Sequence, residues 1–273
     1  ARDADFLVVY ELRMRRMLDL IAYGDGEVRK DILRLLHQLK SRRATQSVAG
    51  LLKWNLEPTV RKHLFQFLKR RSDAEFDILD EIVGKISTAN AQRMVRAVAE
   101  SMPESRRFLL SLLQQRIDPS VKVAALDGLQ EYLRPAEVDE YVAPLVEAPH
   151  GALTALAVET LAAQRPEQVP ELLHPIVRHR LDSYDPQTRQ VIVRHYADCG
   201  GPTAIDVLRS IIRVKKLSDR DRKQRAIDVA RAASRSSNRA VVDLLEAVAD
   251  DWMVSKDVRK ACADAVDSSQ LPD

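Results

Sequence analysis

Two aspartates, Asp118 and Asp127, lie nine residues apart in the stretch RIDPSVKVAALDGLQEYL near the middle of the chain. Paired carboxylates can act as a general acid and a general base, so the pair raises the question of an active site. Asp118, however, directly precedes Pro119, and this order is typical of a helix start, because Asp is favoured at the N-cap and proline at the first helical position. Acids stand at the corresponding positions of other segments, as Asp25, Glu57 and Asp185. Since a catalytic acid is not repeated along a chain, the sequence predicts helix caps at these positions and not acid–base chemistry.

Histidine and cysteine side chains give the remaining candidates for catalysis or metal binding. His195, Asp198 and Cys199 place a base, an acid and a thiol close together, but no third orienting group and no glycine loop that could bind an oxyanion accompany them. His174 and His179 are five residues apart, which differs from the four-residue spacing of a helical zinc motif. The sequence therefore predicts no catalytic residue, no metal site and no cofactor.

The cysteines and the hydropathy pattern bear on where the protein works. Cys199 and Cys262 are 63 positions apart and neither belongs to a CxxC pair, which favours two reduced thiols in a reducing compartment. No apolar run approaches the roughly 18 residues that span a bilayer, and the first residues lack the features of a signal peptide. We therefore expect a cytoplasmic protein without membrane insertion. Because the chain begins without Met and enters an amphipathic pattern almost at once, we also expect a fragment of a longer polypeptide.

The composition favours helices as the elements that carry these residues. The chain has 273 residues, of which 45% are hydrophobic and 30% charged, and it contains only 8 glycines, 12 prolines and 5% aromatic residues. Abundant Ala, Leu, Arg and Glu favour helix over sheet. An all-α fold is therefore predicted.

A recurring unit of sequence extends this prediction. Segments with the same opening, an acid or polar residue, often Pro, then Val and a basic residue, occur at 25–39, 57–71, 118–133, 185–199 and 255–269. The basic position defines a register whose anchors, 29 to 37 residues apart, are Arg29, Arg61, Arg93, Lys122, Arg189, Arg222 and Arg259, with Thr154 in the fifth unit. Every residue four places after an anchor is apolar, and so is every residue seven places after, except Glu100. Because such positions share one face of a helix, each unit predicts a helix with one buried face.

A second amphipathic segment lies between successive units, so the chain predicts about eight helical hairpins. A hairpin of this size cannot bury its apolar stripe alone, and neighbours must stack into a continuous core. The opening Asp118-Pro119-Ser120-Val121-Lys122 and its near copy at 185–189 resemble the HEAT and armadillo-like repeat family, and the resemblance covers essentially the whole chain.

The resemblance implies a single domain over residues 1–273, built as a right-handed α-solenoid of about eight HEAT-like hairpins. In that family the acid and the basic residue make contacts between repeats, and the second helices line a concave, ligand-binding side. The third unit (90–93) lacks the acid and the Val, and the fifth has Thr154 in place of the basic residue. For these two units the resemblance therefore does not predict the contacts between repeats.

The position five places after the anchor varies in chemistry from unit to unit. It is occupied by Arg34, Gln66, Val98, Asp127, Glu159, Arg194, Ile227 and Asp264. Such variation is typical of a solvated face, and this is the interpretation that we favour for Asp127. By resemblance these positions look toward the concave side, where they could select a ligand.

Charge is distributed unevenly along the chain. Residues 1–71 contain 16 Lys or Arg and 8 Asp or Glu (net +8), residues 72–177 contain 9 and 17 (net −8), and residues 178–273 contain 18 and 15 (net +3). Because stacked repeats keep sequence order in space, the first block predicts a basic surface suited to an acidic protein partner. The candidate partner-binding residues are Lys30, Arg34, Arg42, Arg43, Lys62, Lys69, Arg70 and Arg71. Cations also complement helix C-termini, which is a purely structural explanation of the same residues.

Two further segments have a structural interpretation. The basic run at 213–225 is interrupted by Ser218, Asp219 and Asp221, and we interpret it as mainly a solvated turn between helices. The apolar residues Val123, Ala124, Ala155 and Leu156 lie off the core register, so they either are buried by neighbouring helices or form a shallow patch for a partner; burial is favoured.

The function that these observations favour is a non-catalytic protein-binding or scaffold module. A nucleic-acid-binding protein that uses the basic N-terminal repeats, similar to the HEAT-like DNA glycosylases, is the alternative. Only Trp54 and Trp252 offer large stacking surfaces, and the acidic middle of the chain would repel a phosphate backbone. A resemblance to the HEAT-like phycobilin lyases is a third hypothesis, which tetrapyrrole capture would test.

Overall fold

The computed structural model describes residues 13, 16, 17, 19, 20, 23–38, 51, 60, 63, 64, 67, 76–101, 105–147, 149–215 and 218–269. The chain forms two compact units, Ala1–Tyr132 and Leu133–Asp273, and each is described by itself. Within the described residues both units consist of helices and their connections, which confirms the predicted all-α class. The described pairing of extended backbone is limited to one isolated bridge between Lys215 and Val254. None of the helices in the described part of the chain is long and apolar enough to cross a membrane.

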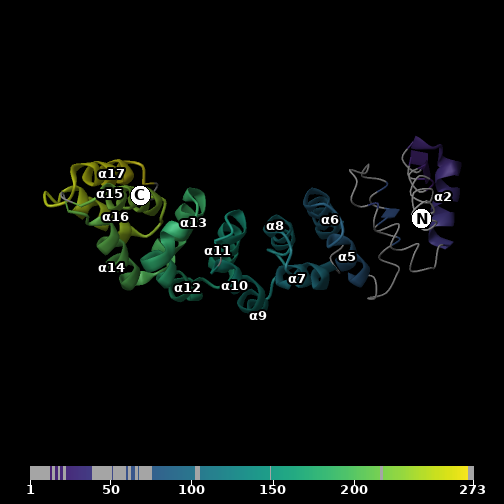
Figure 1. Ribbon diagram of the computed structural model, residues 1–273, viewed down its shortest axis with the longest axis horizontal. Coiled ribbons are helices and arrows are strands. Elements are labelled where there is room, and N and C mark those ends of the chain that lie inside the picture. Colours follow the sequence, from purple (N-terminus) through teal and green to yellow (C-terminus); the bar gives the residue numbers. More distant parts are fainter. Residues whose placement is uncertain are drawn as a thin grey trace. The chain divides into compact units, whose positions relative to one another are not determined.

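The first unit contains helical hairpins that pack on one another. Its described helices are α2 (Gly26–Gln38), α5 (Phe76–Val83), α6 (Thr88–Ser101), α7 (Arg106–Gln114) and α8 (Pro119–Asp127). The second helices α6 and α8 of two successive hairpins pack side by side, and the first helices α5 and α7 pack in the same way (Figure 1). The helices from α5 to α8 are therefore each covered by a helix of a neighbouring hairpin, and α7 and α8 also cover each other.

The second unit repeats this arrangement in two rows of helices. The first helices are α9, η4 and α10 in succession (Pro135–Glu137, Val138–Val142, Ala143–Val146), then η5, α12 and η6 (Pro166–Gln168, Val169–Pro175, Ile176–Arg180), then α14 (Gly201–Ile212) and α16 (Arg239–Ala249). The second helices are α11 (Ala152–Gln164), α13 (Pro186–Cys199), α15 (Arg220–Ala233) and α17 (Lys256–Asp267). Each second helix packs on the next, from α11 to α17, and α14 packs on α12 and on α16. The short 3-10 turn η7 (Leu181–Ser183) precedes α13.

Carboxylates cap three helices as the sequence predicts, namely α2, α8 and α13, whereas α11 and α17 follow Gly151 and Ser255 without a side-chain cap. Asp118 accepts the backbone N–H of Ser120 at 2.9 Å, and Asp185 accepts those of Gln187 and Thr188 at 3.0 and 3.1 Å. Asp25 caps α2 through the backbone N–H groups of residues 27 and 28. These hydrogen bonds satisfy donors that a helix start leaves without a partner, so the acids have a structural role. Glu57 lies outside the described residues.

The basic run at 213–225 forms the predicted connection between helices in its described residues up to Asp219, and it is helical from Arg220 onward. Asp219, one of the acidic or polar residues that interrupt the run, caps α15 by accepting the backbone N–H of Arg222 at 2.7 Å. The anchor follows the cap by four residues at Arg29, Lys122 and Arg189 and by three at Arg222. Arg222 nevertheless keeps the predicted register, because Ala226 and Val229, four and seven places later, are buried.

The predicted buried face is correct at most of the positions that the structure describes. Four places after the anchors, Ala97, Leu126, Val158, Val193 and Ala226 are buried, whereas Ala263 in α17 is exposed. The structure describes no helix after α17, so the side of α17 that carries Ala263 has no described neighbour to cover it. Leu33 and Phe65 cannot be compared, because their side chains are outside the described ones.

The predicted burial of the four apolar residues off the core register is confirmed for one of them. Ala124 is buried at 1% exposure, which confirms burial, while Val123, Ala155 and Leu156 are half-buried. Gly201 has a left-handed backbone (φ 55°) directly after the C-cap of α13, as expected for a glycine that ends one helix, and Pro202 follows in the first turn of α14. The connection between α13 and α14 is therefore very short.

Polar side chains link successive repeats of the second unit. The Tyr184 hydroxyl donates to the Val146 carbonyl at 3.1 Å, and Arg180 Nη2 donates to the Glu147 carbonyl at 2.9 Å. Both acceptors lie at the end of the preceding first helix, where carbonyls have no partner within the helix. Arg165 makes the same kind of link to Asp139, at 2.7 Å. These contacts hold the first helix formed by α9, η4 and α10 against the residues that follow it in the chain.

Candidate binding cavity on the second helices

The predicted basic N-terminal surface can be placed at two residues only. Lys30 and Arg34 are exposed on α2, where they pair with Glu27 (2.9 Å) and Asp31 (3.3 Å). Exposed pairs of this kind contribute about 0–1 kcal/mol and leave both cations accessible. The other candidates lie outside the described residues: Arg42, Arg43, Lys62, Lys69, Arg70 and Arg71. The basic surface therefore stays a prediction.

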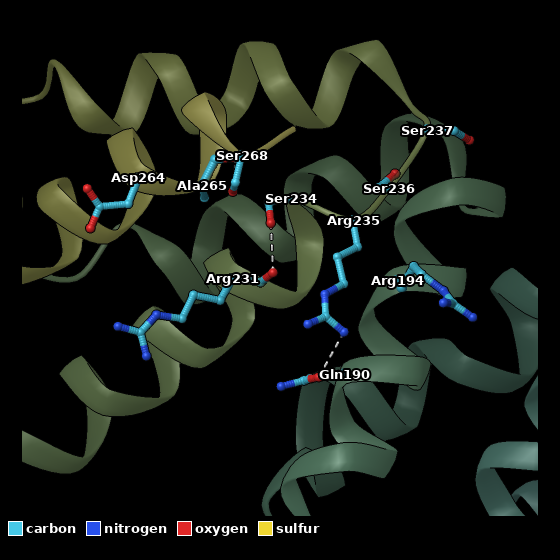
Figure 2. Close-up of a pocket in the computed structure, with 10 residues that line it drawn as sticks. All are labelled: Gln190, Arg194, Arg231, Ser234, Arg235, Ser236, Ser237, Asp264, Ala265 and Ser268. Carbon is cyan, nitrogen blue, oxygen red and sulfur yellow. Dashed lines mark hydrogen bonds between the residues drawn. The ribbon is translucent and has the colours of Figure 1, made fainter. Parts of the chain in front are cut away.

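A cavity of about 720 Å³ opens in the second unit at the C-terminal halves of α13, α15 and α17 (Figure 2). Its lining is almost entirely polar and comprises Gln190, Arg194, Arg231, Ser234, Arg235, Ser236, Ser237, Asp264, Ala265 and Ser268. The three helices are consecutive second helices of the row, so the same end of each one faces the cavity. The volume is in the range of pockets that hold ligands, about 300–1,000 Å³.

Two lining residues belong to the variable column of the sequence. Arg194 and Asp264 stand five places after the anchors of α13 and α17, and both side chains line the cavity. The sequence identified this column as a place that could select a ligand but did not single out these two members. Arg231, Arg235 and the serines were missed, because most of them follow the end of α15, where the helical register no longer applies.

The serine hydroxyls of the lining already donate hydrogen bonds within the protein. Ser234 donates to the Arg231 carbonyl (2.8 Å), Ser268 donates to the Ala265 carbonyl (3.0 Å), and Ser236 and Ser237 donate to Asp198 Oδ1 at 2.8 and 3.1 Å. A hydroxyl has only one proton to donate. The guanidinium groups are therefore the main donors that the cavity offers to a ligand.

The three arginines of the cavity differ in how far their charge is compensated. Arg194 Nη2 lies 3.3 Å from Glu159 Oε1 and 2.7 Å from His195 Nε2. Arg235 Nη1 donates to the neutral amide oxygen of Gln190 at 3.2 Å. The Arg231 side chain has no hydrogen bond or ion pair with any residue that the structure describes. The positive charges of Arg231 and Arg235 thus remain available.

His195 lies next to this cavity and is held neutral. Burial lowers the pKa of His195, and the positive charge of Arg194 lowers it further. Because a guanidinium can only donate, His195 Nε2 accepts the hydrogen bond from Arg194, and the ring proton is on Nδ1. The imidazole thus positions Arg194.

The grouping of His195, Asp198 and Cys199 has a structural explanation. Asp198 Oδ1 accepts hydrogen bonds from the backbone and hydroxyl of Ser237 and from Ser236, so it holds the segment that follows α15. Burial raises the pKa of the Cys199 thiol, and the Asp198 charge adds to this effect, which disfavours a thiolate nucleophile. Both cysteines are free thiols, as predicted, and burial raises the pKa of Cys262 to about 12.

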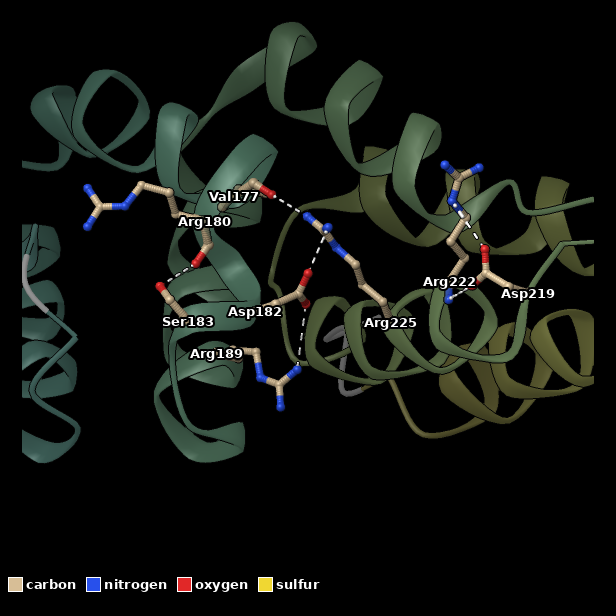
Figure 3. Close-up of polar contacts among 8 residues, drawn as sticks. All are labelled: Val177, Arg180, Asp182, Ser183, Arg189, Asp219, Arg222 and Arg225. Carbon is tan, nitrogen blue, oxygen red and sulfur yellow. Dashed lines mark hydrogen bonds and ion pairs between the residues drawn. The ribbon is translucent and has the colours of Figure 1, made fainter.

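A smaller cavity of about 220 Å³ between α13 and α15 contains arginines with a different role. Arg225 lies 3.0 Å from Asp182 and donates to the Val177 carbonyl at 3.2 Å, and Arg189 lies 3.9 Å from the same carboxylate (Figure 3). These contacts join α15 and α13 to the preceding first helix. Lys122 in the first unit acts similarly, since its Nζ donates to the Leu113 carbonyl of α7 at 2.7 Å, and burial lowers its pKa. Basic residues in the N-terminal halves of α8, α13 and α15 therefore hold helices together.

Metal binding has no candidate among the described residues. No group of three or more His, Cys, Asp and Glu side chains in that part of the chain could hold a metal ion. His174 Nδ1 is 2.8 Å from the Tyr196 hydroxyl, and this hydrogen bond occupies it within the core. A scan against protein-family models gives no match for the sequence, and a search of curated proteins gives none either.

Proposed function

We propose that the protein is a HEAT-like helical-repeat module, a right-handed α-solenoid without catalytic activity, that binds a protein partner through the surface of its second helices. In the second unit this surface is the row from α11 to α17. The proposal includes the predicted basic N-terminal repeats as a second contact region.

The repeated local structure supports the HEAT-like assignment. One second helix in each unit begins with the same Asp-Pro cap, α8 at Asp118 and α13 at Asp185, and carries a basic residue four places later. The described second helices α6 and α8 pack on each other in the first unit, and those from α11 to α17 pack in succession in the second. Repeats that contact mainly their neighbours in this way are characteristic of solenoids, whose extended concave surfaces commonly bind other molecules.

The observation that carries the binding function is the cavity across α13, α15 and α17. It is polar, it is formed by three successive repeats, and it is lined at positions where the repeats differ. Because several repeats form this surface, it can contact an extended protein segment. An enzyme pocket does not need a surface that several repeats form.

The two alternative functions agree less well with the lining. A nucleic-acid site needs aromatic side chains for stacking or a continuous row of cations, and the described residues that line the cavity include no aromatic one but do include the acidic Asp264. A tetrapyrrole has a large apolar ring system, whereas Ala265 is the one apolar residue among the described residues of the lining. A protein segment, which can carry both positively and negatively charged side chains, agrees better with this lining.

Site-specific photo-crosslinking tests the proposal. A benzophenone amino acid is placed at Ser237, in the cavity, and in a matched variant at Ser210, which is exposed on the first helix α14. After irradiation in a native extract, we expect protein adducts at position 237 that are absent at position 210, identified by mass spectrometry.

Two results would refute a partner site on the second helices. One is equal labelling of the same proteins from both positions, which indicates non-specific contact. The other is a nucleic-acid adduct at position 237 that nuclease removes, which would favour the nucleic-acid alternative.

A further inference from the structure

We infer that the cavity on α13, α15 and α17 binds a protein segment of mixed charge, in which acidic side chains pair with Arg231 and Arg235 and a basic side chain lies opposite Asp264. The inference rests on the proposed partner-binding function and specifies the chemistry of the partner. The acidic groups are carboxylates or phosphoryl groups, both of which a guanidinium binds with two parallel hydrogen bonds.

The first step is the supply of hydrogen-bond donors. The lining serines Ser234, Ser236 and Ser237 have committed their only protons to Arg231 and Asp198. A ligand that needs donors must therefore use the arginines, and a guanidinium offers five N–H groups in a planar fork. Groups with two acceptor oxygens in one plane match this fork best.

The second step is the charge that remains uncompensated. Arg194 is opposed by Glu159 at 3.3 Å, whereas Arg235 donates to the neutral Gln190 and Arg231 makes no side-chain hydrogen bond or ion pair with a described residue. Both arginines are exposed to solvent and line the cavity, and their side chains extend in different directions in Figure 2. Two positive charges of one cavity without a carboxylate partner attract an anionic ligand.

The third step is the sign reversal along the cavity. Asp264 and Arg194 lie at opposite ends in Figure 2, with Arg235 between them and Arg231 extending toward the side of Asp264. The carboxylate of Asp264 is exposed and has no ion pair with a described residue. It would repel a uniformly anionic chain such as a nucleic acid, but it would attract a Lys or Arg side chain. A segment with acidic and basic side chains satisfies the whole cavity.

The arginines of the neighbouring region make a useful contrast. Arg189 and Arg225 are half-buried and share Asp182, so a carboxylate of the protein already opposes both charges. Arg209 and Arg239 on the first helices are exposed and pair with Asp206 and Asp243 at 2.9 and 3.0 Å. Unlike these four arginines, Arg231 and Arg235 line the large cavity and have no carboxylate partner among the described residues.

Fluorescence anisotropy with short labelled peptides tests the inference. The probes are a peptide with a run of Glu followed by Lys, the reversed order, an all-Lys peptide, a phosphoserine version of the first, and a single-stranded oligonucleotide. The protein is the full 273-residue chain, as wild type, as Arg231→Ser/Arg235→Ser, as Asp264→Asn and as the control Arg209→Ser/Arg239→Ser, which removes the same charge from the first helices. Circular dichroism verifies that each variant is folded.

We expect one of the two mixed peptides to bind wild type, and the cavity double variant to weaken this binding about tenfold or more, since two charge-assisted pairs are lost. The control double variant should change it less than about twofold, because exposed, paired arginines contribute little. Asp264→Asn should reduce the preference for one charge order over the other. Stronger binding of the phosphoserine peptide assigns the anion as phosphoryl, and equal or weaker binding assigns it as carboxylate.

Three results overturn the inference. Equal losses in the two double variants would mean that only net charge matters. Tighter binding of the oligonucleotide than of every peptide, lost in the cavity variant, would assign the cavity to nucleic acid. Absence of peptide binding at low salt, together with retained protein crosslinks at position 237, would refute the charge assignment while leaving the partner-binding proposal intact.

Discussion

The two ends of the second helices differ in how much they vary between repeats. At the N-terminal ends, Asp118 and Asp185 cap α8 and α13 with the same hydrogen bonds, and a basic residue follows after one turn. At the C-terminal ends, the same register position carries Arg194 in α13 and Asp264 in α17. The N-terminal ends of α8 and α13 are chemically alike, although α11 follows Gly151 and α17 follows Ser255 without a side-chain cap. The column near the C-terminal ends changes sign between α13 and α17, and we call these two parts of the helices the uniform end and the variable end.

This difference separates residues that build the repeat from residues that can recognise a ligand. The uniform end satisfies backbone groups and joins neighbouring helices, as Lys122 and Arg225 show through their bonds to carbonyls. The variable end lines the cavity. We therefore expect substitutions at the uniform end to change stability, and substitutions at the variable end to change binding.

The largest effect on stability should come from the core that both ends share. Leu161 in α11 is fully buried, and Leu161→Ala should lower the free energy of unfolding by about 2–5 kcal/mol, because it removes apolar contacts and leaves a cavity. Leu156→Ala, on the same helix but half-buried, should cost clearly less. Urea denaturation measures both values; similar losses would contradict the burial difference.

The next effect should appear at the caps. Asp185→Ala removes the acceptor for the backbone N–H groups of Gln187 and Thr188 and should cost about 1 kcal/mol. Asp264→Ala, the same change at the variable end, should stay within about 0.5 kcal/mol. Chemical denaturation of the two variants in parallel tests the difference between the ends directly. An equal loss of unfolding free energy in both variants would contradict that difference.

A pH dependence should follow from the same caps. The hydroxyl of Thr188 donates to Asp185 and, with backbone N–H groups, lowers the pKa of this carboxyl in the folded state. Its stabilising effect is therefore present above the unfolded pKa, about 3.9, and is lost as the pH falls through the lower folded value. Asn also caps helices well, so Asp185→Asn should retain the cap but lose stability less steeply below pH ~4. Thermal melts across acidic pH measure the slopes, and identical slopes would exclude Asp185 as a contributor.

The smallest effect on stability should occur at the cavity. Arg231→Ser removes a side chain that contacts no described residue, so the free energy of unfolding should change by less than about 0.5 kcal/mol. Thermal denaturation of the same protein that is used in the peptide-binding experiment measures this change in unfolding free energy. A loss as large as that of Asp185→Ala would show that Arg231 belongs to the framework of the repeat.

The sequence predicts the framework better than the cavity, and the residues show why. Caps at Asp118 and Asp185 and buried positions such as Leu126 and Val193 follow from local rules that recur with the repeat. Arg235 follows the last residue of α15, so no helical register places it. The cavity also depends on how far apart α15 and α17 pack, which is a property of three-dimensional stacking and leaves no signal in a single unit.

The π-helical turns of the second unit have a consequence for the history of the repeats. η4 (Val138–Val142) and η6 (Ile176–Arg180) interrupt two consecutive first helices, and a π turn closes its hydrogen bond over one residue more than an α turn. An inserted residue can therefore be accommodated inside a helix, without lengthening a loop. Copies of a duplicated unit that have come to differ in length can still stack through their second helices, so a lineage could change the length of its repeats without losing the surface that they form together.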